Sequence, residues 1–409
     1  MTDKKTELAS EEKICGSECY KMLSSGTEEI IQTDQLSNKL SSHTPLTIKL
    51  GFDPTAPDIH LGHSVVLRKI RQFQTLGHRI RIIIGDFTGM IGDPTGKSQI
   101  RKRLSPEEVA ENAETYKKQI FKIIDPGKTE ILLNSEWLSP KRFTDVLELL
   151  SHYTVARLLE RDDFSKRFQN NQPISMIEMM YPLIQGYDSV VLKADIEIGG
   201  TDQKFNMLVG RELMRTYGME PQVIITMPIL EGLDGGQKMS KSLKNYVGIC
   251  DSPSEMFGKI MSIPDTLIIR YFSLLTDCSP EEISSMQNDL TKGINPRDIK
   301  IRLAQTIVRQ YHTAAEAEAA AHDFFTVFSQ KGIPENISEI TISPEPIWIV
   351  DLIARTGYLN SNNEIRRQIK AGAVKLDSRP VFDDTQTVSP HTGQIIKIGK
   401  RGFFKIKTG

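Results

Sequence analysis

Residues 46–63, LTIKLGFDPTAPDIHLGH, pass from a β-rich run through a turn into a helix, and this passage decides the fold. Leu46–Phe52 is rich in aliphatic and β-branched residues, which predicts a strand. The Gly, Pro and Asp residues that follow predict a turn. From Leu61 to Leu76 the spacing of apolar residues predicts a helix. A strand that leads directly into a helix is typical of an α/β fold.

The same alternation continues to about Val247. We expect strands at Leu46–Phe52, Arg79–Gly85, Thr129–Asn134 and Gln222–Met227, and helices at Leu61–Leu76, Ser105–Ile124 and Asp202–Tyr217. Ser105 and Glu108 form a capping box, with Pro106 at the first helical position. Strands separated by crossover helices predict a largely parallel sheet. Ligands of such sheets bind at the carboxyl ends of the strands.

The pattern changes after Tyr246. Ser252, Pro253 and Glu255 open a capped helix, and only helical periodicity follows to about Lys331. The next residues, 331–346, carry three prolines without periodicity and are interpreted as a linker. Beyond them we expect two short helices and then strands at Ala373–Leu376, Gln394–Ile398 and Phe403–Ile406.

Charge is unevenly distributed over the 409 residues, although the net charge is only −1. The segment 347–409 holds eleven Lys and Arg residues against five Asp and Glu residues. A basic tail on an acidic body is typical of a polyanion-binding appendage.

Composition excludes several classes of protein. The first residues are charged and show no secretory signal, and no apolar run approaches the length of a membrane span. Four cysteines are too few for a disulfide framework. Cys15 and Cys19 are the only close pair, so a zinc site is not expected, and we predict reduced thiols and a cytoplasmic location.

Two histidines stand at the start of the helix that begins near Leu61. His60 and His63 are three residues apart in its first turn and should point the same way. Together with free backbone N–H groups and the helix dipole they predict an anion site. Gly62 between them would leave room for a flat ligand to lie on the backbone. The alternative is a pair of ordinary surface histidines.

QKMSKS, residues 237–242, follows a glycine-rich stretch. A mobile loop with Lys238 and Lys241 is suited to closing over a polyphosphate and meeting the charge that grows in the transition state. Met239 would pack on an apolar neighbour. A solvated basic loop is the alternative. Its position just beyond an expected strand favours the functional interpretation.

GDPTGKS, residues 92–98, is similar to a P-loop but lacks its first glycine, because Ile91 stands at that position. We therefore interpret it as a glycine-rich loop that presents Lys97 and Arg101 to a phosphate.

Tyr181, Gln185 and Asp188 recur at i, i+4 and i+7, so on a helix they share one face. A polar stripe on a segment rich in Met, Ile and Leu is costly to bury unless a ligand or another side chain bonds to it. The alternative is a half-exposed helix with its own hydrogen bonds. IGGTDQ, residues 198–203, follows closely.

HLGH at His60–His63 and KMSKS at Lys238–Ser242, in this order across an α/β domain, resemble the two signatures of class I aminoacyl-tRNA synthetases. GFDPTAP, GDPTGK, YPLIQGYD and GGTDQ are similar to phrases of the bacterial tyrosyl-tRNA synthetases, and GGTDQKFN with KMSKS resembles the second of their two types. The resemblance runs from about Leu46 to the C-terminus, because the basic tail also matches.

The resemblance implies a set of site residues. ATP contacts would fall on Asp53, Thr55, His60, Gly62, His63, Gly200, Asp202, Lys238, Met239, Lys241 and Ser242. Tyrosine contacts would fall on Lys49, Asp93, Tyr181, Gln185, Asp188 and Gln203. The catalytic set would be His60, His63, Lys238, Lys241, Ser242, Lys97 and Arg101, the last two on a mobile pyrophosphate loop.

One position departs from the family. Many members have a tyrosine against the substrate phenol, two residues before the glycine of GFDP, where this chain has Lys49. Either the ammonium group replaces that donor or Asp188 reads the phenol.

The implied fold is a Rossmann-like parallel-sheet catalytic domain followed by an α-helical domain and a small α+β RNA-binding domain. The expected parts are an N-terminal helical extension (1–40), a catalytic domain (41–246) with a dimer-forming insertion at about 105–190, a helical anticodon-binding domain (247–331), a linker (332–346) and a basic RNA-binding domain (347–409) like that of the small-subunit ribosomal protein. RNA contacts would fall on Arg366, Arg367, Lys370, Lys397, Lys400 and Arg401.

The implied reaction joins L-tyrosine to ATP, releases pyrophosphate and passes tyrosine to the terminal adenosine of tRNA(Tyr). Mg²⁺ would arrive with ATP, no tightly bound protein-liganded metal is expected, and the enzyme would be a homodimer. Competing interpretations are a tryptophanyl-tRNA synthetase, a small nucleotidyltransferase that shares His-x-Gly-His, and a non-catalytic RNA-binding paralogue.

Overall fold

The computed structural model describes residues 17–42, 44–54, 58–93, 105–329, 337–359, 361–377, 379–399 and 402–409. The chain divides into two compact units, Met1–Tyr311 and His312–Gly409. None of the helices in the described ranges is long and apolar enough to cross a membrane.

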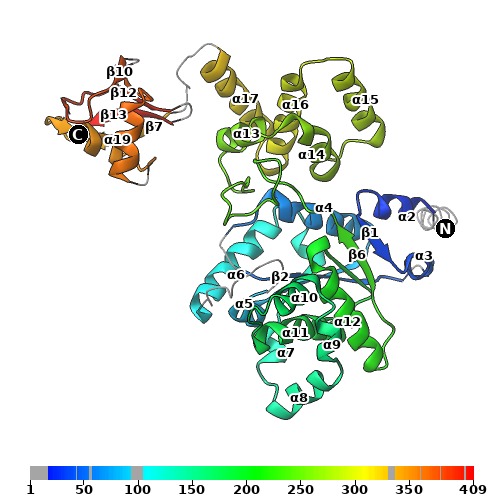
Figure 1. Ribbon diagram of the computed structural model, residues 1–409. Helices are drawn as coiled ribbons and strands as arrows, with labels where there is room; N and C mark the ends of the chain where they lie inside the picture. The colour runs from blue at the N-terminus through cyan, green and yellow to red at the C-terminus, as the bar shows by residue number, and fades with distance from the viewer. Residues whose placement is uncertain are drawn as a thin grey trace, which may run out of the picture. The chain divides into compact units, whose positions relative to one another are not determined.

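The first unit is built on a six-stranded sheet in the order β1-β6-β5-β2-β3-β4. Figure 1 labels β1, β2 and β6 of this sheet. Its parallel strands are β2 (Thr47–Phe52), β3 (Arg79–Ile84), β4 (Thr129–Leu133), β5 (Ile196–Gly200) and β6 (Val223–Met227). The short strand β1 (Glu29–Ile31) pairs antiparallel with β6. The predicted parallel sheet is confirmed, and the four expected strands are present within one residue of their expected bounds. β1 and β5 were not expected.

Strand order reverses at β2. The chain runs from β2 outward through β3 to β4 and then returns to β5 on the other side of β2. In open α/β sheets a ligand binds in the crevice at such a reversal, beyond the carboxyl ends of the strands. The loops after β2 and β5 therefore frame the expected site.

Helices cover this sheet and form most of the segment at about 105–190, which was expected to be an insertion. Their bounds are α2 (Ser17–Ser24), α3 (Thr33–Ser41), α4 (Leu61–Thr75), α5 (Asp86–Ile91), α6 (Pro106–Ile120), α7 (Ser135–Leu138), α8 (Phe143–Ser151), α9 (Val155–Leu158), α10 (Asp162–Gln169), α11 (Met176–Leu192) and α12 (Lys204–Thr216). The capping box of Ser105 and Glu108 at the start of α6 is confirmed.

Helices α11 and α12 approach each other closely because glycines face each other between them. A Cβ atom on Gly186 would lie 2.9 Å from the backbone nitrogen of Gly210. Real Cβ atoms do not come so near, so a side chain at Gly186 would push the two helices apart. This contact sets the spacing between the polar stripe of α11 and the residues of α12.

A purely helical region completes the first unit. It contains α13 (Pro253–Met261), α14 (Ile268–Leu275), α15 (Pro280–Thr291) and α16 (Pro296–Tyr311), and the side chain of Ser252 caps α13 as predicted. The short 3-10 turns of the unit are η1 (Pro126–Lys128), η2 (Thr201–Gln203) and η3 (Asp265–Leu267).

The second unit begins with α17 (Ala314–Ser329) and contains a five-stranded sheet in the order β10-β9-β12-β13-β7. The strands are β7 (Ser338–Ile342), β9 (Val374–Leu376), β10 (Arg379–Val381), β12 (Ile395–Ile398) and β13 (Gly402–Thr408). β8 (Ile347–Trp348) pairs with β11 (Thr387–Val388), and the helices are α18 (Ile349–Ala354) and α19 (Asn362–Lys370).

β7 lies inside the stretch interpreted as a linker and pairs parallel with β13. Ile340 packs against the core of the unit and Ile342 belongs to it, while Glu339 and Thr341 are exposed. Side chains that alternate between core and solvent with a period of two indicate a strand. The surrounding prolines obscured this pattern in the sequence.

Candidate active site

The two histidines of HLGH lie together at the start of α4. The Nδ1 atom of His60 accepts a hydrogen bond from the backbone nitrogen of Gly62 at 3.2 Å, and the Nδ1 atom of His63 accepts one from the backbone nitrogen of His60 at 3.3 Å. Their rings stack with centroids 3.9 Å apart. Because each Nδ1 accepts, each neutral ring carries its proton on Nε2 and can donate it to a ligand.

Both rings are neutral at pH 7. Loss of water around the ring, followed by the nearby charges of Lys241 and Lys238, lowers the pKa of His63 to about 4. Burial, and then His63 and the same two lysines, lower the pKa of His60 well below its ordinary value. The histidines therefore supply N–H donors, and the positive charge of the site comes from the lysines.

The absence of a side chain at Gly62 also matters for the packing of His60. A Cβ atom at this position would lie 3.0 Å from the His60 ring. The absent side chain thus makes room for the ring that caps the helix, and the same Cβ position is 3.6 Å from Met239.

The KMSKS segment is one side of a hairpin that lies against HLGH. Glu231 and Lys238 form an antiparallel bridge, and the backbone nitrogen of Met239 donates to the Leu230 carbonyl at 2.8 Å. Met239 is buried, as predicted. After the hairpin, the chain forms a second bridge between Gly248 and His60. The two signatures, which are far apart in the sequence, are therefore brought together.

The two lysines of the hairpin differ. The Nζ atom of Lys238 lies 3.3 Å from Asp202 Oδ2, in a pair that is about half exposed. The Nζ atom of Lys241 is buried and has no hydrogen-bond partner among the described residues. Its nearest ion pair there is with Asp58, at 4.0 Å. Burial lowers the pKa of Lys241 to about 8, so most of it remains charged at pH 7. An under-neutralised cation beside two N–H donors is suited to an anionic ligand.

The polar stripe of α11 is buried against other elements of the site. Tyr181 donates from its hydroxyl to Asp53 Oδ2 at 2.7 Å, and Asp188 Oδ1 accepts from the indole of Trp137 at 2.8 Å. Gln185 Oε1 accepts from Asn206 at 2.9 Å. The alternative of a half-exposed helix with its own hydrogen bonds is therefore wrong for Tyr181 and Asp188.

Residues from three further segments meet this stripe. Gln203 donates to Asp93 Oδ2 at 2.8 Å, and Asn206 also donates to Gln203 Oε1 at 3.2 Å. Burial raises the pKa of Asp188 to about 7, against the opposing effect of Lys49. The predicted tyrosine contacts thus surround one region at the reversal of strand order.

Lys49 lies beneath this region and is almost fully buried. Its Nζ atom is 2.8 Å from Glu197 Oε1 on the neighbouring strand and 2.7 Å from Ser189 Oγ. It also donates to the backbone carbonyl of Gln185 at 3.2 Å. Three acceptors therefore use the donors of this ammonium group.

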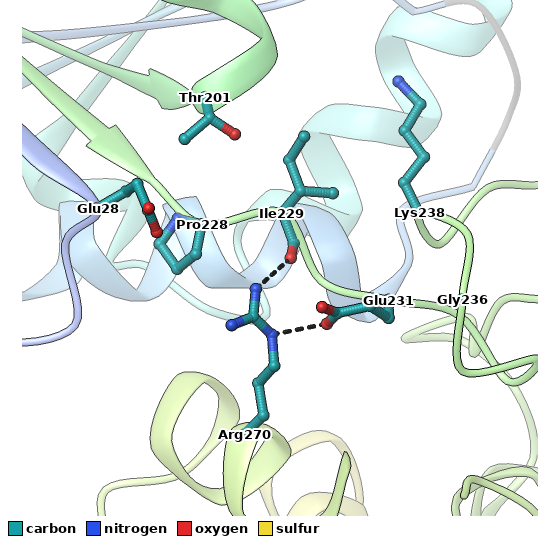
Figure 2. A pocket seen from close by; sticks show the side chains of 8 residues that line it. All are labelled: Glu28, Thr201, Pro228, Ile229, Glu231, Gly236, Lys238 and Arg270. Atoms are coloured by element: carbon teal, nitrogen blue, oxygen red, sulfur yellow. Dashed lines mark hydrogen bonds and ion pairs between the residues drawn. The ribbon is translucent and has the colours of Figure 1, made fainter. Parts of the chain in front are cut away.

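A pocket of ≈ 460 Å³ opens beside Lys238, between the sheet and α14 (Figure 2). Its lining comes from the residue before β1, the start of η2, the residues that follow β6, the hairpin and α14: Glu28, Thr201, Pro228, Ile229, Glu231, Gly236, Lys238 and Arg270. It lies on the lysine side of the site and is wide enough for part of a small ligand.

Apart from Asp202, the remaining predicted site residues are not part of the contacts described above. Thr55, Lys97, Arg101, Lys400 and Arg401 lie outside the described residues. Gly200 ends β5 and Asp202 follows in η2. Ser242 contacts the Ser240 hydroxyl at 2.9 Å. In the second unit, Arg366, Arg367 and Lys370 are exposed on α19, and Lys397 is partly buried over the ring of Phe403.

Comparisons with known proteins show which family the chain belongs to. A family model described as tRNA synthetases class I (W and Y) matches residues 41–329. The tyrosine–tRNA ligase of Moorella thermoacetica is 52% identical over 393 residues, which cover 95% of each chain. The tyrosine–tRNA ligase of Carboxydothermus hydrogenoformans is 53% identical over 392 residues, covering 93% of this chain and 95% of the relative. The chain belongs to the tyrosine–tRNA ligase family.

Solved structures of tyrosyl-tRNA synthetases share the fold. A C-terminally truncated mitochondrial enzyme from Aspergillus nidulans has a TM-score of 0.65 at 20% identity and covers 79% of this chain and 97% of its own. The enzyme from Archaeoglobus fulgidus, solved with L-tyrosine, has a TM-score of 0.61 at 23% identity and covers 75% and 99%. Membership in the tyrosine–tRNA ligases excludes the tryptophanyl and small-nucleotidyltransferase alternatives.

Sequence reasoning missed three residues of this tyrosine–tRNA ligase site. Trp137 bonds to Asp188, Asn206 joins Gln185 to Gln203, and Glu197 pairs with Lys49. Glu197 carried a signal, because a charge within an apolar strand predicts a buried partner. Trp137 and Asn206 carried none, since their roles depend on how distant segments pack.

Proposed function

We propose that the described site activates L-tyrosine with ATP and that the chain then transfers tyrosine to the 3′-terminal adenosine of tRNA(Tyr). The observation that carries this proposal is the buried Lys241 ammonium, which lacks a hydrogen-bond partner among the described residues and lies beside the neutral donors of His60 and His63. Such a cluster suits phosphate oxygens better than it suits a neutral ligand.

In the activation step a carboxylate oxygen of tyrosine forms a bond to the α-phosphorus of ATP. The bond from that phosphorus to the bridging oxygen breaks, and pyrophosphate leaves with its electron pair. The carboxylate is already ionised at pH 7, so no base is needed. Catalysis then consists of positioning and of stabilising charge on the phosphates.

Each group on the phosphate side has a proposed task. His60 and His63 donate from Nε2 to phosphate oxygens. Lys241 meets the charge that develops on the departing pyrophosphate, and Lys238 exchanges Asp202 for phosphate when ATP binds. Mg²⁺ belongs to the ATP complex as part of the substrate. The remaining proposed ATP contacts are Asp53, Thr55, Gly62, Gly200, Met239 and Ser242, with Lys97 and Arg101 on the pyrophosphate.

On the amino-acid side we assign the phenol to Asp188 and not to Lys49. The three acceptors around Lys49 Nζ leave it without a spare donor. The carboxylate of Asp188 keeps an acceptor site beyond its bonds to Trp137 and Asn134. Tyr181, Gln185, Asp93 and Gln203 then surround the substrate amine and ring.

The tRNA is assigned to the helical region and the second unit. Arg366, Arg367 and Lys370 are exposed on α19, and Asp384 Oδ2 lies 3.9 Å from Arg366 and 3.5 Å from Lys370. Three exposed cations on one helix suit a phosphate backbone. Lys397, Lys400 and Arg401 are proposed to extend this surface.

Dimer formation is assigned to the insertion at about 105–190. Large apolar side chains are exposed on its consecutive helices α8–α11: Phe143 at 75%, Leu147 at 50%, Val155 at 55%, Phe168 at 63% and Met176 at 70%. So many exposed apolar residues in one segment are typical of a surface covered by a partner, and we propose a second copy of the chain. The described cysteines Cys19, Cys250 and Cys278 are free thiols, and we propose a cytoplasmic location.

The test is pyrophosphate exchange into ATP with each of the twenty amino acids, followed by transfer of labelled tyrosine to tRNA(Tyr). We expect exchange with tyrosine and charging of that tRNA. Exchange with a different amino acid would reject Asp188 as the phenol reader. RNA binding without any exchange would indicate the non-catalytic paralogue.

A further inference from the structure

Helix α14 contacts the hairpin that carries the KMSKS lysines. Arg270 donates from Nε to Glu231 Oε2 at 2.6 Å and from Nη2 to the Ile229 carbonyl at 2.9 Å (Figure 2). The adjacent Tyr271 donates its hydroxyl to the Glu231 carbonyl at 2.7 Å. One turn of α14 therefore holds both the backbone and the side chain at the base of the hairpin.

α14 holds the side of the hairpin that contains Ile229 and Glu231. The lysines proposed to act on phosphate follow on the opposite side. Glu231 bridges Lys238 across the hairpin, and Gly232 donates to the Gln237 carbonyl at 2.8 Å. The tip between them contains Gly235 and Gly236 and is held by Asp234, whose carboxylate accepts from the backbone nitrogens of Gly236 and Gln237 and from Asn245 Nδ2. A displacement of Glu231 would thus be passed to Lys238 and, two residues beyond Met239, to Lys241.

The other end of α14 is tied to the helix that begins at HLGH. Asp277, just beyond α14, pairs with Arg68 and with Arg71 of α4, the latter at 3.0 Å. α14 thus connects the helix that positions His60 and His63 with the hairpin that positions the lysines. Its eight residues form a strut of about 12 Å, at about 1.5 Å per residue.

We propose that Arg270 is a positioning residue for adenylate formation, which sets the place of Lys238 and Lys241 relative to His60 and His63 through Glu231 and Ile229. Arg270 need not touch ATP or tyrosine for this role. The proposal rests on the proposed activation chemistry, because it assigns a residue that acts through Lys238 and Lys241.

The contribution of Arg270 to the free energy of unfolding can be separated from its effect on the placement of the lysines. The Arg270–Glu231 pair is about a third exposed, and exposed pairs contribute little to the free energy of unfolding. A displacement of a catalytic group by about 1 Å, in contrast, can cost up to about 10²-fold in rate. Loss of Arg270 should leave the fold intact and slow the reaction.

The experiment measures single-turnover formation of tyrosyl-adenylate and tyrosine binding for Arg270→Met in the full chain. We expect a fall of about tenfold in the rate at saturating substrates, with tyrosine affinity unchanged, since only lysine placement is altered. Arg270→Lys keeps the charge but cannot reach both acceptors, and it should be intermediate. The matched control is Arg302→Met, which removes an exposed pair with Glu282 elsewhere in the helical region and should have no effect.

A mutant cycle with Lys238→Ala and Lys241→Ala combined distinguishes positioning from direct contact with ATP. If Arg270 acts through these two lysines, its substitution should cost less than twofold once both are absent. Independent, multiplying losses would overturn the proposal, as would an Arg270→Met rate equal to that of Arg302→Met. Absence of tyrosine-dependent exchange in the unmodified chain would instead reject the proposed function. Should Arg270→Met fail to fold, Glu231→Gln with the same cycle decides the question.

Discussion

The proposed amino-acid side and the proposed phosphate side of this site differ in how their polar groups are paired. On the amino-acid side, Asp188, Gln185 and Lys49 are bonded to other protein groups before any substrate arrives. On the phosphate side, Lys241 is buried without a hydrogen-bond partner among the described residues. The first arrangement holds a shape rigidly and suits selection of a side chain. The second retains uncompensated positive charge for charge that develops during the reaction.

The largest effect should follow from removing that charge. Lys241→Ala should lower the rate of tyrosyl-adenylate formation by about 10²–10³, as expected when one preorganised donor to developing charge is lost. Tyrosine affinity should stay nearly constant, because Lys241 lies on the phosphate side. Rapid-quench kinetics and equilibrium binding measure the two quantities. Lys118→Ala, an exposed charge removal on α6, is the control, and an equal loss of tyrosine affinity in Lys241→Ala would remove the distinction between the two sides.

A smaller effect is expected on the amino-acid side. Asp188→Asn keeps an acceptor for Trp137 but removes the carboxylate proposed to accept from the phenol, which with a pKa of about 7 is ionised in about half of the molecules at pH 7. Discrimination between tyrosine and phenylalanine should fall about tenfold to a hundredfold, the range for a hydrogen bond to a charged group. The ratio of kcat/KM for the two amino acids in pyrophosphate exchange measures it, with Glu130→Gln as an exposed control. Unchanged discrimination would return phenol recognition to Lys49.

Removal of residues 330–409, which include the basic segment 347–409, should affect neither side of the proposed site. A chain ending at Ser329 should form tyrosyl-adenylate at the full rate but charge tRNA about tenfold less well at moderate salt, with a shallower salt dependence. A cut near Glu345 is less suitable, because it leaves β7 without β13. Replacing Arg366, Arg367 and Lys370 by Gln in the full chain tests the same surface without truncation. Charging that keeps its level and its salt dependence would assign the tRNA to the helical region alone.

The smallest effect concerns pH. With a pKa of about 4, His63 stays neutral at pH 5.5, and the pKa of His60 is also lowered. The unfolded chain binds protons at these rings below about pH 6.5 while the folded chain does not, so their contribution to stability declines as the pH falls from about 6.5 to 4. Nitrogen chemical shifts should report a neutral imidazole with the proton on Nε2 for His63 at pH 5.5, and a lowered pKa for His60. An imidazolium signal from His63 at that pH, or a pKa of His60 that is not lowered, would contradict this assignment.

Much of the fold followed from local patterns in the sequence. β2, β3, β4 and β6 are apolar runs next to clear turn signals, and α6 and α13 carry their own caps. β5 was missed because its second half, Gly199–Gly200, looks like a loop, although Gly199 leaves room for Met207. β7 was missed because prolines surround it. In both cases the strand depends on neighbours that are distant in the sequence.

The site divides in the same way. His60, His63 and the hairpin lysines belong to contiguous motifs whose chemistry is visible in the residues themselves. Glu197, Asn206 and Trp137 act only through partners brought near by the sheet and by the close approach of α11 and α12. Local reasoning identifies the donors to a ligand more readily than the residues that hold those donors in place.

The position of β13 has a consequence for synthesis of the chain. β13 lies between β12 and β7, so residues 402–408 must be made before the sheet of the second unit can close. β7 pairs with β13, so it stays unpaired while the helices and strands between them are being made. Closing so long a loop is a step of the kind that slows folding. The first unit contains all of its strands by Met227 and can fold earlier, because domains generally fold as they emerge. A nascent chain thus acquires its adenylation site before its basic unit is complete.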